Sequence, residues 1–205
     1  MTTRRWTPLV LLALAAAAAC DGSSGPDAEI RQPGELTILR MAADAPPLET
    51  YDTTFTAIRG VNSELRIDYE PLPGESSGEE FLRFELDNAT LVNDEHGDPI
   101  PIGGSIEIRV RIVDPARLEF EFQPAGLRFN AAEPAQLRIR YANADDDFDD
   151  DGDVDADDDL AEQRLGLWRQ EVPGEPWVKM GSVVLEDLEE VEGEIFGFTR
   201  YSIAF

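Results

Sequence analysis

Eleven aspartates lie within the fifteen residues from Asp145 to Asp159, and their order is that of a metal-binding loop. With Asp147 counted as position 1, carboxylates stand at alternate positions and Gly152 stands at position 6. Oxygen ligands from alternate residues can converge on one Ca²⁺, glycine permits a sharp turn, and Asp153 at position 7 would contribute its backbone carbonyl. The sequence therefore predicts a calcium site. Its candidate ligands are Asp147, Asp149, Asp151, Asp153, Asp155 and Asp158.

This loop resembles the calcium loop of EF-hands, and more closely the dockerin variety, because aspartate rather than glutamate occupies its last position, Asp158. The shorter side chain favours weak binding, with a Kd of about 10⁻⁴ to 10⁻³ M. The aliphatic Val154 at position 8 is expected to point away from the ion and to fix the loop to the protein. A strand precedes the loop, so we expect no incoming helix, but a short helix should follow over residues 157–164. The alternative is a disordered acidic insertion whose composition imitates the spacing.

The elements that would position this loop are strands, because apolar and polar residues alternate along most of the chain from Leu36. The clearest alternation lies in residues 106–112 and 118–122, and it recurs in residues 65–69 and 137–141. Looser strand patterns occupy residues 53–59, 80–86, 164–170, 183–187 and 193–198. Short turns rich in Gly, Pro and Asp separate them. This pattern predicts an all-β protein, an antiparallel sandwich with the acidic loop inserted. One continuous unit over residues 36–205 is favoured over two sandwiches divided near residues 93–104.

Composition excludes several classes of function. The chain has 205 residues, and its 43 acidic and 17 basic side chains give a formal charge of −26. Such a surface would repel the phosphate backbone, so we expect no binding to nucleic acid. One cysteine rules out a disulfide within the chain, and one histidine, His96, removes most histidine-dependent chemistry. The motifs of common hydrolases and nucleotide-binding enzymes are absent from the sequence, so we expect a protein that is not an enzyme.

The N-terminus carries an export signal. Arg4 and Arg5 precede an apolar run that ends in small residues at Cys20, the pattern of a secretory signal peptide over residues 1–19. The alanines directly before Cys20 resemble a bacterial lipobox. This resemblance implies that Cys20 becomes the first residue of the mature chain, carries acyl chains and holds the protein on the extracytoplasmic side of a bacterial membrane. Residues 20–35, rich in Gly, Ser and Pro, would form a flexible tether.

The second half, residues 105–205, resembles the ZU-five domain, a β-sandwich found in scaffold proteins. The matching stretches are residues 120–129, Pro134 with the strand after it, and the closing sequence Phe198-Thr199-Arg200-Tyr201. The resemblance implies a sandwich with an interaction or scaffold role. Some members of that family cut themselves before a serine with the help of a histidine. Here Gly197 and Thr199 replace those two residues, so the base is missing and cleavage is not expected.

Together these observations predict a lipid-anchored cell-envelope sandwich that serves as an interaction or structural module with a calcium-stabilised loop. Its partners would be the membrane, through Cys20, and a protein or glycan. One alternative is a carbohydrate or cell-surface binding module, which an exposed Trp168 or Trp177 would favour. A second alternative is a hydrolase with an atypical carboxylate site.

Overall fold

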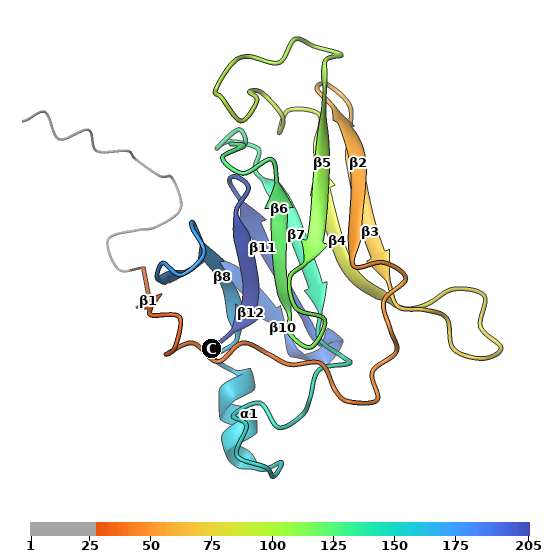
Figure 1. Cartoon of the computed structure of the whole chain (residues 1–205), viewed down its shortest axis with the longest axis vertical. Helices are drawn as coiled ribbons and strands as arrows, with labels where there is room; N and C mark the ends of the chain where they lie inside the picture. Colours follow the sequence, from red (N-terminus) through yellow and green to blue (C-terminus); the bar gives the residue numbers. More distant parts are fainter. Residues whose placement is uncertain (1–27) are drawn as a thin grey trace, which may run out of the picture.

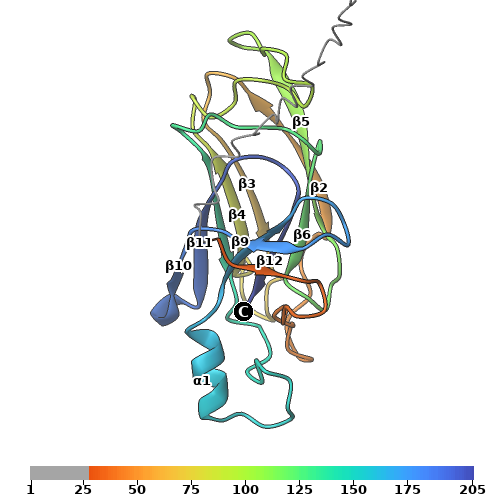
Figure 2. The ribbon, with the colours of Figure 1, turned by 90° about the vertical axis from the view of Figure 1, so that its left-hand side faces the viewer.

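Two antiparallel sheets pack face to face in the computed structural model, which describes residues 28–205 (Figures 1 and 2). The predicted signal peptide and the predicted lipidation site, Cys20, lie outside these residues. The first sheet has the order β1(Ile30–Arg31), β9(Trp177–Lys179), β8(Gly166–Gln170), β12(Arg200–Ala204), β6(Glu119–Gln123), β5(Ser105–Ile112) and β2(Asp52–Ile58). The second has the order β10(Ser182–Leu185), β11(Glu190–Ile195), β7(Ala135–Arg140), β4(Glu80–Leu86) and β3(Ser63–Asp68). The predicted all-β sandwich is confirmed.

Both halves of the chain build both sheets. In the first sheet β5 pairs with β6, which pairs with the C-terminal β12; in the second, β4 pairs with β7. One hydrophobic core extends from Leu39 to Ile203. The chain from residue 36 onward therefore forms one sandwich rather than two.

The strand faces follow the alternation in the sequence. In β5, Ile108 and Val110 are fully buried while Glu107 and Arg109 are exposed. Opposite charges on the outer faces meet across strands: Arg111 lies opposite Glu121 and binds it, and the Arg138 side chain lies 2.7 Å from Glu192. Such cross-strand pairs fix the register more than they add stability, since each contributes about 0.2–1 kcal/mol at most. The charges therefore largely pair with one another on a solvated face.

Ordered structure begins earlier than the tether prediction implies. β1 lies within residues 20–35, and its Ile30 and Arg31 pair with Val178 and Trp177 of β9. The prediction of a tether is therefore wrong for these two residues, because main-chain pairing at a sheet edge needs no apolar period in the sequence. No helix within residues 28–205 is both long and apolar enough to cross a membrane.

The acidic loop connects β7 to β8 and contains the short helix α1(Ala156–Glu162) (Figure 1). Loop and helix project from one end of the sandwich, as both views show (Figures 1 and 2). The predicted short helix is present, with its start one residue earlier and its end two residues earlier than expected. Within residues 28–205, the other helical element is the 3₁₀ segment η1(Glu186–Leu188), which joins β10 to β11.

Candidate metal centre

Helix α1 begins where it does because of two aspartates. The Asp155 carboxylate accepts a hydrogen bond from the Asp157 N–H at 2.7 Å, and the Asp158 carboxylate accepts one from the Asp155 N–H at 2.8 Å. These reciprocal bonds form a capping box around the first turn. Acidic side chains at a helix N-terminus also interact favourably with the helix dipole. Two of the predicted ligands thus cap the helix.

Three of the predicted ligands converge. Carboxylate oxygens of Asp147, Asp149 and Asp151 all lie within 4.8 Å of one another. The Asp147 carboxylate also accepts hydrogen bonds from the N–H groups of Asp151 and Gly152, at 3.1 and 3.0 Å. Gly152 has a φ of +99°, a conformation that a residue with a Cβ adopts only with strain. The glycine at position 6 therefore makes the turn that brings the first and fifth positions together.

Asp158 lies beside this group with a different set of partners. It is 3% exposed, and its Oδ1 accepts hydrogen bonds from the N–H groups of Phe148 (2.7 Å) and Asp149 (3.3 Å). With the bond from Asp155 to Oδ2, both of its oxygens are engaged by main chain. Asp158 thus links the start of the loop to the start of the helix. Asp153 and Asp155 likewise lie outside the group formed by Asp147, Asp149 and Asp151, hereafter the aspartate triad.

The pKa values of the loop carboxyls reflect these surroundings. Burial raises the pKa of Asp149, and the nearby charges of Asp151 and Asp158 raise it further. The charges of Asp151 and Asp155 raise the pKa of Asp153. The pKa of Asp158 is lowered, because the N–H groups of Asp155, Asp149 and Phe148 stabilise its charged form. The triad region is therefore one of mutual repulsion, which a bound cation would relieve.

Phe148 and Arg40 hold the loop against the sandwich. Phe148 packs against the core and meets Tyr141 edge-on, with ring centroids 6.5 Å apart. Arg40 Nη2 lies 2.5 Å from Asp150 and 3.9 Å from Asp145. The Tyr141 hydroxyl donates to Glu162 of α1 at 2.8 Å. The loop is thus attached at both ends.

Val154 does not have the predicted role, since it is 66% exposed. The expectation that it fixes the loop to the protein is wrong, because the helix begins two residues later and leaves Val154 on the solvent side. Phe148, the only aromatic residue in the aspartate run, does this instead, and its apolar character was the available signal. Arg40 could not be found from the sequence, because it lies 110 positions from its partner Asp150.

The other residues that the sequence suggested for ligand binding or catalysis are buried, hydrogen-bonded to main chain or located in an exposed turn. Trp168 is fully buried and donates from Nε1 to the Ala204 carbonyl at 2.9 Å, and Trp177 is 3% exposed. The Thr199 hydroxyl bonds to the carbonyl of Glu171 at 3.0 Å and to that of Gln170. His96 is exposed in a turn whose N–H groups bond to Asp94.

Comparison with known proteins gives no relative: no family model matches the chain, and neither a curated protein nor a solved structure matches it.

Proposed function

We propose that this protein is a lipid-anchored module of the bacterial cell envelope whose acidic loop binds one calcium ion and is ordered by it. The observation that carries the proposal is the convergence of the aspartate triad within 4.8 Å, at positions 1, 3 and 5 of a calcium-type loop. Hard carboxylate oxygens in this number suit Ca²⁺, with further oxygens from main chain and water. Bound calcium would offset the repulsion between carboxylates, which raises the pKa of Asp153 and adds to the effect of burial in raising that of Asp149.

We further propose that the sandwich is an interaction or structural part rather than an enzyme. The lipobox-like sequence at Cys20 supports attachment to a membrane, and the ZU-five-like motifs in residues 105–205 support a scaffold role. The carbohydrate alternative depended on an exposed tryptophan, and the burial of Trp168 and Trp177 leaves neither ring free to stack on a sugar. The hydrolase alternative needs two facing acids in a deep cleft, and the loop carboxylates that line a pocket with Arg40 are candidates for them. However, Asp150 is paired with Arg40, and Asp147 is bonded to main chain.

Thermal unfolding in chelator and then in 0 to about 10 mM calcium tests the calcium site. If the Kd lies in the range of about 10⁻⁴ to 10⁻³ M, about 10 mM calcium should add roughly 1.4–2.7 kcal/mol. That corresponds to a rise in midpoint of about 3–10 °C for a chain of this size.

Asp147→Ala and Asp151→Ala should abolish the rise, since each removes a member of the triad. Asp146→Ala is the matched control, because Asp146 is an exposed aspartate of the same loop outside the triad, and it should keep the rise. An unchanged midpoint in the wild-type chain, or equal shifts in all variants, would refute the calcium site.

A further inference from the structure

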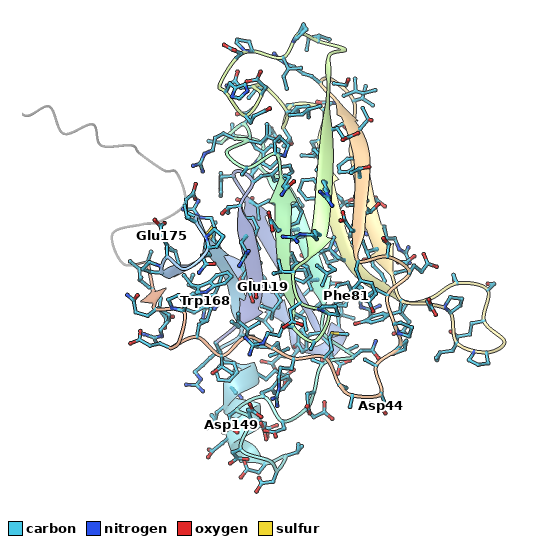
Figure 3. The ribbon with its side chains drawn as sticks, in the orientation of Figure 1. Asp44, Phe81, Glu119, Asp149, Trp168 and Glu175 are labelled. Atoms are coloured by element: carbon cyan, nitrogen blue, oxygen red, sulfur yellow. The ribbon has the colours of Figure 1, made fainter. Side chains whose placement is uncertain are left out.

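An apolar pocket lies at the end of the sandwich beneath residues 41–51, hereafter the arch. The pocket has a volume of about 380 Å³. Its floor consists of Phe81, Leu48 and Ile112, which are at most 6% exposed. Phe81, in β4, and Asp44, in the arch, are labelled in Figure 3. No residue of the aspartate triad lines this pocket, but Asp147 lines a neighbouring pocket that shares Arg117 with it.

The pocket is hollow because the arch is fixed at both ends and carries small side chains between them. The Met41 N–H donates to the Ala116 carbonyl at 3.1 Å, and the Ile112 N–H donates to the Tyr51 carbonyl at 2.9 Å. Between these ties the lining side chains other than Leu48 are alanines and prolines. They are Ala42, Ala43, Ala45, Pro46 and Pro47. Residues this short do not reach the floor, and prolines restrict the main chain. The cavity is therefore a consequence of how residues 41–51 are held and of their short side chains.

Arg117 is the only charged residue that lines the pocket. Its nearest ion-pair partner among residues 28–205 is Asp114, at 4.0 Å from Nε, and both side chains are about half exposed. By contrast, Arg40 lies 2.5 Å from Asp150, and Arg111 is in close contact with Glu121. Within residues 28–205, the Arg117 guanidinium thus has one long ion pair and most of its donors uncommitted, and it lies between the apolar pocket and a neighbouring pocket lined by Asp145, Asp147 and Asp150.

From this combination we propose that the pocket binds an unbranched aliphatic monocarboxylate, with its chain on Phe81, Leu48 and Ile112 and its carboxylate paired with Arg117. A cavity of about 380 Å³ is at the lower end of the range of small-ligand pockets, roughly 300–1,000 Å³, which suits one chain of medium length such as that of a ten-carbon acid. Arginine binds carboxylates through two parallel hydrogen bonds. A single negative charge fits better than a phosphate dianion, because Asp114 lies beside Arg117 and Asp44 lies in the arch.

Calorimetric titration of the full chain with sodium decanoate, kept below its micellar concentration, tests this proposal. Cys20→Ser is carried throughout to prevent acylation. Decanoate should bind saturably at one molecule per chain, while decyltrimethylammonium, which has a similar tail and the opposite charge, should not bind. Arg117→Gln should weaken decanoate binding about tenfold. Arg109→Gln is the matched control, since Arg109 is similarly exposed but lies on the outer face of β5, and it should bind as the parent does.

Substitutions that fill the cavity test whether the aliphatic chain of the ligand occupies it. Ala45→Leu and Ala116→Leu each place a larger side chain in the lining, and either variant that retains the parent's thermal midpoint should lose decanoate binding. The proposal is overturned if the parent shows no saturable binding. It is equally overturned if decyltrimethylammonium binds as tightly as decanoate, if Arg117→Gln binds like Arg109→Gln, or if a stably folded filled variant binds as before.

Discussion

Phe84→Ala is expected to lower the free energy of unfolding by about 3–5 kcal/mol, the largest effect of any single change considered. Phe84 is fully buried in β4, and its ring contacts two rings of the facing sheet and two from segments between strands. These rings belong to Phe55, Phe122, Phe129 and Phe198, with centroids 5.4–6.2 Å away. Truncation would remove these contacts and leave a cavity that neighbouring strands, fixed by their hydrogen bonds, can close only in part.

Urea unfolding followed by tryptophan fluorescence measures this loss. Leu72→Ala is the control, because Leu72 is 53% exposed in a loop and should change the free energy by less than about 0.5 kcal/mol. A loss below about 1 kcal/mol for Phe84→Ala would show that the two sheets do not share the aromatic core described above.

Asp158→Asn is expected to weaken calcium binding by about 10- to 100-fold. The substitution replaces one carboxylate oxygen by an amide that cannot accept a hydrogen bond, and so disrupts the contacts with the N–H groups of Phe148, Asp149 and Asp155. These contacts orient the main chain on both sides of the triad. Calorimetric titration with calcium measures the affinity.

A second readout separates this positioning role from direct ligation of calcium. Because the bonds to Asp158 exist without an ion, the variant should exchange the amide hydrogens of Phe148 and Asp155 faster than the wild type in chelator. Asp146→Ala should change neither exchange nor affinity. Unchanged exchange in Asp158→Asn would contradict the positioning role.

Alternation in the sequence located the long strands well. Strands such as β5, with Ile108 and Val110 inward and Arg109 outward, have a period of two because one face is buried and the other is solvated. The edge strand β1 and its neighbour β9 have two and three residues, too few to show a period. Their position depends on main-chain pairing with a neighbour, which no local pattern encodes.

The candidate site was also predictable only in part, because local spacing shows some of its contacts and the tertiary fold determines the rest. Spacing predicted that Asp147, Asp149 and Asp151 would meet, because a loop turning at Gly152 brings alternate residues to one side. Spacing could not show that Asp158 would bind main-chain N–H groups, since a carboxylate at that position can accept from a donor or bind an ion. The contact of Arg40 with the loop depends on the tertiary fold and is invisible locally.

The central claim, a calcium site at the aspartate triad, is tested most directly by calorimetric titration of the chelator-treated chain with calcium chloride. We expect one ion per chain with a Kd of about 10⁻⁴ to 10⁻³ M, and no saturable binding to Asp147→Ala. The absence of saturable binding to the wild-type chain, or the same binding in wild type and Asp147→Ala, would contradict the account.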